Sequence, residues 1–362
     1  MQKPAFKILS IDGGGIRGII PCTILEFIEK HTQRPIYQLF DLMAGTSTGG
    51  IITAGLCTPK QNANVPHTAA EMAQIYLTYG KTIFGKRQRN WLANVLSKIN
   101  KTIGEMFNKN YDEAAIEQLL TEYFADKKLC DSLIDIIITT YDLQERKPFY
   151  FSSRLAKEAD ISNWLIREMV RSTSAAPTYF EPNIMTYKGK RLVTVDGGVF
   201  ANNPAILAYG EAKELWKMRQ SQLVVDESAE KGRDYSAIVQ ASDSDVPFYM
   251  LSIGTGYHDK NETDLSHIEQ WSTREWIKLL LTDVFMQSVA ESTDYTMQHL
   301  LPLYTDGTAR YQRFNVPLTN QQTAMDNAQN IPSLKKSTEN YIEANREALL
   351  QVCEMLMANN LN

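Results

Sequence analysis

The sequence contains few cysteines and has no long apolar run. Its four cysteines are far apart and form no C-x-x-C pair: Cys22, Cys57, Cys130 and Cys353. Neither a disulfide framework nor a zinc ribbon is indicated, and a reducing compartment fits this pattern best. No stretch approaches the roughly 18 continuous apolar residues that a membrane-spanning helix needs. Any contact with a membrane is therefore expected to be peripheral.

An excess of basic residues is also lacking. Lys and Arg number 37 against 42 Asp and Glu, which gives a formal net charge of -5. The chain thus has no global positive field for nucleic acid, and no nucleic-acid partner is expected. The opening residues MQKPAFKILSIDGGG hold too short an apolar run for the core of a signal peptide. We therefore expect a cytoplasmic protein, peripheral to the inner face of the membrane.

The rest of the composition is that of a globular protein. Of the 362 residues, 43% are hydrophobic and 22% are charged, which allows one α/β domain with accessory helices. Residues 6–11 and 39–44 are predicted as short buried strands. Each is followed by a glycine-rich turn and an apolar helix, at residues 16–29 and 51–56. Two such units predict a mostly parallel sheet covered by helices.

Further strands and helices are expected along the chain. The predicted strands are residues 134–141, 191–195, 248–253 and 311–316. The predicted helices are residues 164–174, residues 204–216 and most of the chain after residue 272. Residues 221–245 are polar with little periodicity, which indicates a surface insertion or a mobile loop.

A G-x-S-x-G motif, residues 45–49, lies between a predicted strand and a predicted helix. Serine on such a tight turn exposes its hydroxyl, and the following helix directs its amide-rich amino terminus at charge developing there. Glycine and serine also form ordinary turns, so the pentapeptide alone does not establish a nucleophile. Its position directly after a predicted strand favours Ser47 as one.

Three consecutive glycines, Gly13, Gly14 and Gly15, follow the first predicted strand and precede Arg17. Their amides can approach a substrate oxygen closely and together, as an oxyanion hole requires. The same residues spell G-x-G-x-x-G, the dinucleotide-binding fingerprint. That alternative expects an acidic residue after the second strand, but here the strand runs straight into the serine turn and Asp41 lies before its end. The oxyanion hole is favoured.

Asp196 begins a D-G-G segment that also follows a predicted strand. A lone segment of this kind is usually an ordinary β-turn. A carboxylate on a glycine turn at the edge of a sheet can, however, reach a site on a neighbouring strand. Because the carboxyl ends of strands in an open parallel sheet form the ligand crevice, we expect Ser47, the glycine turn and Asp196 to meet there.

Histidine, the usual base for a catalytic serine, is scarce. The five histidines are His31, His67, His258, His267 and His299. His258 is the best candidate among them, since it follows Ser47 and Asp196 in chain order as in hydrolase triads, although an ordinary loop residue is the commoner interpretation of such a histidine. The alternative is that Asp196 accepts the serine proton directly. A carboxylate does this poorly unless desolvation raises its pKa, so the site is then expected to be dry.

Taken in order, the segments DGGGIRG, GTSTGG and DGG resemble those of the patatin-like phospholipases. Three further segments fit the same pattern, namely SAAPTYF at residues 174–180, ANNPA at 201–205 and LSIGTG at 251–256. The resemblance covers about residues 5–316, which is most of the chain. Six ordered motifs are far more specific than any one of them.

The resemblance implies a three-layer α/β/α sandwich with a mostly parallel sheet. It also implies that Ser47 and Asp196 form a catalytic dyad that hydrolyses fatty acyl esters of membrane phospholipids without a cofactor or metal. The amides of residues 13–15, with the Arg17 turn behind them, would form the oxyanion hole. We place the phospholipase domain at residues 1–320 and a helical C-terminal extension at 321–362.

A basic amphipathic helix is predicted within residues 81–109. The segment carries seven basic residues against the single acid Glu105: Lys81, Lys86, Arg87, Arg89, Lys98, Lys101 and Lys109. Apolar residues, Trp91 among them, recur there at helical spacing. Such a helix either anchors the protein to an anionic membrane surface or packs its apolar face on the protein's own core as a cap or lid.

Two other functions stay open from the sequence alone. Some bacterial proteins of this layout resemble antiphage effectors that a cyclic nucleotide activates, so a lipase core under the control of a nucleotide activator is one alternative. The other is a non-catalytic module that keeps the glycine turns for binding a nucleotide or a lipid. Labelling of Ser47 by a fluorophosphonate would separate an enzyme from such a module.

Overall fold

A mixed eight-stranded sheet organises the molecule in the computed structural model, which describes residues 6–83, 113–177, 179–231, 248–258, 268–270 and 286–358. Its strands are β1 (Phe6–Ile11), β2 (Leu42–Thr46), β3 (Asp135–Asp142), β4 (Lys147–Ser152), β5 (Asn183–Tyr187), β6 (Lys190–Asp196), β7 (Phe248–Ile253) and β9 (Tyr311–Phe314). The order is β5-β6-β3-β2-β1-β7-β9, and β4 pairs with β3 beside this path. Two short strands, β8 (Tyr257–His258) and β10 (Pro317–Leu318), pair separately.

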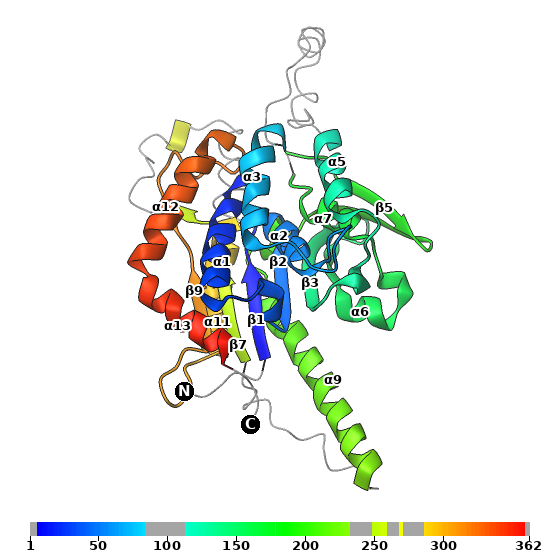
Figure 1. Cartoon of the computed structure of the whole chain (residues 1–362). Coiled ribbons are helices and arrows are strands. Elements are labelled where there is room, and N and C mark those ends of the chain that lie inside the picture. The colour runs from blue at the N-terminus through cyan, green and yellow to red at the C-terminus, as the bar shows by residue number, and fades with distance from the viewer. Residues whose placement is uncertain are drawn as a thin grey trace.

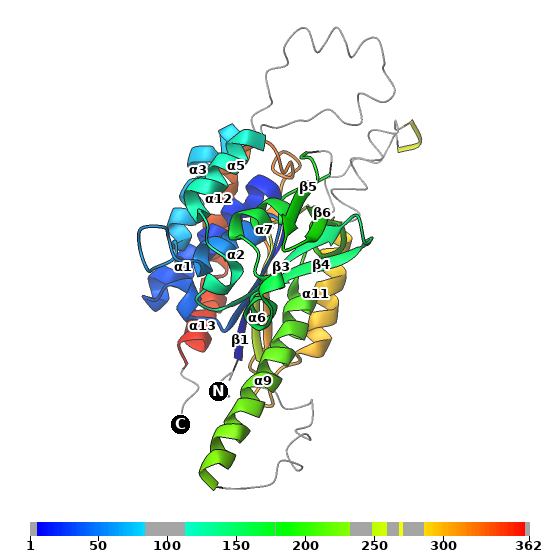
Figure 2. The same cartoon turned by 90° about the vertical axis from the view of Figure 1, so that its right-hand side faces the viewer.

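Helices cover both faces of the sheet (Figure 1). One face carries α1 (Ile19–Thr32), α2 (Thr48–Cys57), α3 (Ala69–Ile83), α5 (Glu113–Phe124), α7 (Ile166–Thr173), α12 (Ile331–Ala344) and α13 (Arg346–Met357). The opposite face carries α9 (Ala205–Lys231) and α11 (Ser288–Leu300), as Figure 2 shows. Two short helices, α6 (Ser153–Glu158) and α8 (Gly198–Ala201), lie in connections. The predicted three-layer α/β/α sandwich is confirmed.

Side chains of the central strands alternate between two hydrophobic cores. In β1, Leu9 and Ile11 belong to the core beneath α1 and α2, whereas Phe6 and Ile8 belong to the core beneath α9. Successive side chains of a strand point to opposite faces, so a strand covered on both sides must be apolar throughout. This is why β1 and β7, which are fully buried, read as continuous apolar runs.

Most predicted elements are present, with differences at the edges of the sheet. The pairs β1–β2, β1–β7, β2–β3 and β7–β9 are parallel, as expected. Strands β4 and β5, which the sequence analysis did not predict, pair antiparallel, as does β6. Helix α9 ends at Lys231, so the first part of the segment expected as a loop at residues 221–245 is helical. A helix already formed extends more easily than a new one starts.

Two expectations fall largely outside the described residues. The predicted basic helix at residues 81–109 overlaps α3 only at its start, and the rest lies outside. The end of the polar segment, residues 232–245, lies outside as well. The helices α12 and α13 share the hydrophobic core with α1, and the domain boundary at residue 320 stays a prediction.

Candidate active site

Ser47 lies on a sharp turn between β2 and α2. Its backbone has φ 54° and ψ −122°, a strained conformation for a residue with a side chain. The turn is also tight, because a Cβ atom added to Gly49 would lie 2.2 Å from the carbonyl oxygen of Ile11. The Ser47 amide donates a 2.8 Å hydrogen bond to Oγ1 of Thr173, which fixes the turn from a neighbouring helix. The hydroxyl is thus held at the end of β2.

Asp196 lies near the end of β2 because β2 and β6 pair with the same edge of β3. Strand β4 occupies one edge of β3, so β2 and β6 must follow one another along its other edge. The last pair of β2 joins Thr46 to Thr139, and the pair at the end of β6 joins Asp196 to Thr140. Because β2 and β6 run in opposite directions, their carboxyl ends meet. We expected this convergence from parallel strands; an antiparallel strand produces it instead.

The Asp196 carboxylate is almost fully buried, with 3% of the residue exposed. Burial raises its pKa to about 7, because the charged form loses its hydration. A hydrogen bond from the Ser47 side chain acts in the opposite direction, as does a 2.7 Å hydrogen bond from the Gly198 amide. The carboxylate is therefore buried on the same cavity wall as the serine and largely withdrawn from water.

The glycine turn lies against Ser47. A Cβ atom added to Gly13 would lie 3.2 Å from the Ser47 Cβ, so the two backbones are in close contact. The Gly13 amide donates a 3.0 Å hydrogen bond to the Asn202 carbonyl. Within the described part of the chain, the amides of Gly14 and Gly15 make no hydrogen bond. Of the three predicted oxyanion donors, Gly14 and Gly15 thus have their amides available, whereas that of Gly13 is engaged.

The glycine turn is held in place from a distant part of the sequence. The amide of Ile16 donates a 2.9 Å hydrogen bond to the carbonyl of Met325. Gly15 has φ +60°, and a Cβ atom there would lie 2.4 Å from the same carbonyl oxygen, so only glycine fits. The Arg17 amide and side chain both donate to the Gly14 carbonyl, at 3.2 and 3.4 Å. Arg17 thus closes the glycine turn and lies behind the amides of residues 13–15, where the sequence places it.

Ser47 and Asp196 lie on the wall of a cavity of about 290 Å³. Most of the other side chains that line it are apolar, among them Ile75, Ile116, Leu119, Leu120, Phe180 and Met325. They come from α3, α5 and the segments after α7 and β10. A cavity with this lining accommodates a hydrocarbon chain and excludes water from the carboxylate beside it.

None of the histidines that the structure describes lines this cavity. The imidazole of His258 hydrogen-bonds to Oδ1 of Asn320 instead. His31 and His299 contact backbone carbonyls of their own helices, and His67 lies 3.6 Å from the Glu71 carboxylate. His267 is outside the described residues.

The sequence analysis missed three contributors to the site. Thr173 binds the Ser47 amide, Asn202 binds the Gly13 amide, and the carbonyl of Met325 holds the glycine turn. Asn202 lies in the ANNPA segment that was noted for its resemblance alone, without a role. No local signal marks Met325, because its contribution is made by the backbone.

The α/β fold and the apolar cavity define a class of protein that can bind a lipid-like ligand, and comparison with known families makes the class specific. The model of the patatin-like phospholipase family matches residues 9–209, the span that contains the glycine turn, Ser47 and Asp196. The chain therefore belongs to the patatin-like phospholipases and is a lipid acyl hydrolase by family. The predicted resemblance is confirmed.

Individual relatives extend the likeness over most of the chain. Patatin-like protein 2 of Oryza sativa subsp. indica is 33% identical over 302 residues, which cover 79% of this chain and 71% of that protein. Patatin group J-1 of Solanum tuberosum is 30% identical over 373 residues, covering 97% and 83%. The crystal structure of VipD from Legionella pneumophila aligns with a TM-score of 0.34 and 12% identity over 92% of this chain and 67% of that one, a likeness too weak to add to the assignment.

Helices that cross a bilayer must be both long and apolar. Among the described residues, no helix meets both requirements.

Proposed function

We propose that this chain hydrolyses fatty acyl esters of membrane phospholipids through a dyad of Ser47 and Asp196. The observation that carries the proposal is that Ser47 and the buried Asp196 lie on the wall of one apolar cavity, where burial raises the pKa of the carboxylate to about 7. A base works best when its pKa is near the working pH, and desolvation brings Asp196 there. The apolar cavity beside both residues supports a lipid substrate.

The first half of the reaction forms an acyl-enzyme. The Ser47 oxygen attacks the ester carbonyl, and its proton passes to Asp196. The negative oxygen of the tetrahedral intermediate is stabilised by the amides of Gly14 and Gly15 and by the amino terminus of α2, where each lost donor typically costs about 3 kcal/mol. As the intermediate collapses, the bond to the alcohol oxygen breaks. Asp196 returns its proton to that oxygen, and the lysolipid leaves.

The second half releases the fatty acid. Asp196, again a carboxylate, takes a proton from a water molecule that attacks the acyl carbonyl on Ser47. The same amides stabilise the second oxyanion, and the proton returns to the serine oxygen as the acyl bond breaks. One ester bond and one water are consumed, and one fatty acid and one alcohol are formed.

The apolar cavity supplies most of the binding energy for the acyl chain. Each buried methylene contributes about 0.8 kcal/mol, so a chain that fills the cavity displaces water and keeps Asp196 dry during the reaction. The substrate would be drawn from a membrane surface by peripheral contact. The basic segment at residues 81–109 supports such contact by its charge, as a prediction from sequence.

Lipid-product mass spectrometry on mixed phospholipid vesicles tests the proposal. We expect wild type to release fatty acid and lysophospholipid. Ser47→Ala and Asp196→Asn are each expected to lower the rate at least about 100-fold with the fold intact by circular dichroism. His258→Ala, which replaces the histidine favoured by chain order, is expected to retain hydrolysis. An active Asp196→Asn, or a folded but inactive His258→Ala, would overturn the dyad.

A further inference from the structure

A second cavity, of about 460 Å³, lies on the other side of the glycine turn. It is bordered by Asp12 and Arg17, which flank the glycine turn, by the carboxyl ends of β7 and β9, and by one face of α11. Met286 lines both this cavity and the apolar cavity that contains Ser47. The two cavities are therefore neighbours, and they differ in chemistry: the first is apolar, and the second is lined mainly by charged, amide and tyrosine side chains.

Gly13 lies between Ser47 and Asn202, a residue of the second cavity wall. Asn202 lines the cavity, and a Cβ atom added to Gly13 would lie 2.6 Å from Oδ1 of Asn202 and 3.2 Å from the Ser47 Cβ. Asn202 is 5% exposed, and within the described part of the chain its Oδ1 has no hydrogen-bond partner. A buried polar atom without a partner is unusual, and here it borders a polar cavity next to the reaction centre.

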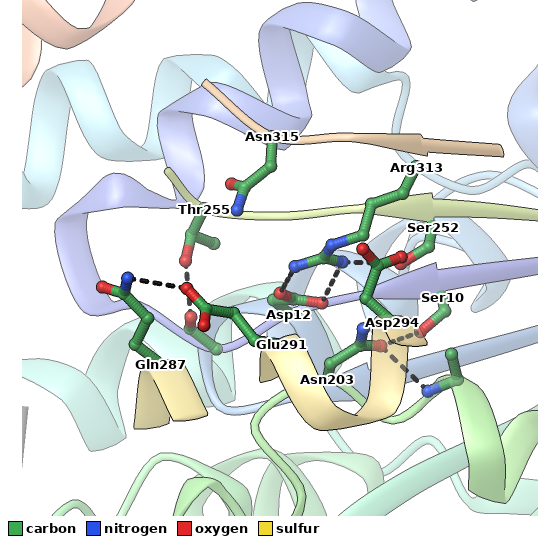
Figure 3. Close-up of polar contacts among 12 residues, drawn as sticks. Ser10, Asp12, Asn203, Ser252, Thr255, Gln287, Glu291, Asp294, Arg313 and Asn315 are labelled. Atoms are coloured by element: carbon green, nitrogen blue, oxygen red, sulfur yellow. Dashed lines mark hydrogen bonds and ion pairs between the residues drawn. The ribbon is translucent and has the colours of Figure 1, made fainter. Parts of the chain in front are cut away.

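The charges around the cavity leave a surplus of carboxylate. Asp12 and Arg313 form a buried ion pair, with Nη2 of Arg313 2.6 Å from Oδ2 of Asp12. Asp294 interacts electrostatically with the same guanidinium, and Glu291 precedes it by one turn of α11. Figure 3 shows both α11 carboxylates pointing toward the strand ends that carry the pair. With Arg17 included, three carboxylates face two guanidinium groups, a net charge of -1.

Three tyrosines complete the lining: Tyr257, Tyr311 and Tyr341. The hydroxyl of Tyr311 donates a 2.8 Å hydrogen bond to Asp294, which orients that carboxylate at the cavity wall. Aromatic faces and carboxylates together are the surroundings that bind alkylammonium groups, through cation–π attraction and charge. A ligand with several phosphates is disfavoured by the surplus of carboxylate.

We propose that the second cavity binds the ammonium group of a phospholipid head group, choline or ethanolamine, with Glu291 and Asp294 as its charge partners. The inference rests on the proposed hydrolysis at Ser47. Because Met286 lines both cavities, an ester at Ser47 with its acyl chain in the apolar cavity can extend its head group into the neighbouring polar cavity. The enzyme then selects zwitterionic phospholipids over those that carry only negative charge.

Binding is measured first, without turnover, by calorimetry on full-length Ser47→Ala. The probes are free phosphocholine, micellar lysophosphatidylcholine and glycerol phosphate. We expect both choline compounds to bind more tightly than glycerol phosphate. In a background with Glu291→Gln and Asp294→Asn, their Kd is expected to rise about three- to tenfold. Binding of the micelle alone would assign the site to an assembled lipid surface, and equal Kd values in both backgrounds would overturn the inference.

Selectivity is measured next, as the ratio of kcat/KM for phosphatidylcholine to that for phosphatidylglycerol with identical acyl chains. The double variant is expected to lower this ratio about three- to tenfold. The matched control Glu347→Gln removes one exposed carboxylate on α13 and is expected to leave the ratio unchanged. An equal fall in kcat/KM for both lipids would show that Glu291 and Asp294 have only a structural role, and it would overturn the inference. Hydrolysis that survives Ser47→Ala would refute the proposed function, whereas the calorimetry decides the ammonium site independently.

Discussion

Asp196 is buried, and its carboxylate contacts Ser47 and the Gly198 amide. Its pKa of about 7 in the folded protein compares with 3.8 for an unperturbed side chain. The same shift that makes it a base at neutral pH also affects stability, because the folded protein must bury a charge whenever the group ionises. At the scale of one residue, the burial that makes Asp196 a base at neutral pH therefore also lowers the stability of the folded protein.

The raised pKa of Asp196 predicts that the effect of Asp196→Asn on the free energy of unfolding depends on pH. Between about pH 4 and pH 7 the folded protein keeps a proton that the unfolded chain has released, so the free energy of unfolding falls as the pH rises through this window. Asparagine carries no charge and escapes this loss. We expect the variant to be more stable than wild type at about pH 8, by on the order of 3 kcal/mol, and the gain to disappear near pH 4.

Urea unfolding at several pH values measures this gain. A difference between variant and wild type that does not change with pH, or a variant that is less stable at about pH 8, would contradict a raised pKa at Asp196.

At the scale of elements, the turn between β2 and α2 depends on close backbone contact. Gly49→Ala would place a Cβ 2.2 Å from the Ile11 carbonyl oxygen, which is backbone and cannot move aside cheaply. We expect a loss of about 2 kcal/mol or more in the free energy of unfolding.

The matched control for Gly49→Ala is Gly210→Ala in α9, where an added Cβ meets nothing within 4 Å. Alanine in a helix interior stabilises by about 0.5 to 1 kcal/mol relative to glycine, so this variant is expected to be as stable as wild type or more so. Thermal unfolding compares the two. Equal effects of both substitutions would show that the turn is not sterically constrained.

The sequence predicts the central elements well and the edge of the sheet poorly. Strands β1 and β7 are buried on both faces, so their apolar runs are unmistakable. Strands β4 and β5 are partly exposed, so their apolar patterns are weak, although each pairs antiparallel with a strand next to it in the sequence: β4 with β3, and β5 with β6. The motifs around Ser47, Asp196 and the glycine turn could be found because each is local.

What joins these motifs could not be read from the sequence. The sharing of one edge of β3 by β2 and β6, and the bond from Ile16 to Met325, depend on non-local register. The second cavity likewise needs α11 to be placed against the ends of β7 and β9.

At the scale of the whole molecule, the C-terminal helices are joined to the start of the sheet. The Lys7 side chain of β1 donates hydrogen bonds of 2.7 and 2.9 Å to the carbonyls of Leu356 and Ala358, at the end of α13. These carbonyls lack partners within the helix, so the ammonium group caps it.

Lys7→Met keeps the length of the side chain and removes the cap. We expect α13 to open more readily, by about 1 to 3 kcal/mol, while the amides of β2 and β3 keep their protection. Hydrogen exchange read by mass spectrometry measures both regions in one experiment. Unchanged exchange in α13 would mean that apolar packing on α1 alone holds the helix.

The central claim is that Asp196, without a histidine, activates Ser47, and it is tested most directly by the rate at which a fluorophosphonate labels the protein. The dyad predicts that the label lies on Ser47 and that the rate rises with pH through about 7. It also predicts that Asp196→Asn lowers the rate at least about 100-fold. Labelling of Ser47 in Asp196→Asn at the wild-type rate would contradict the claim.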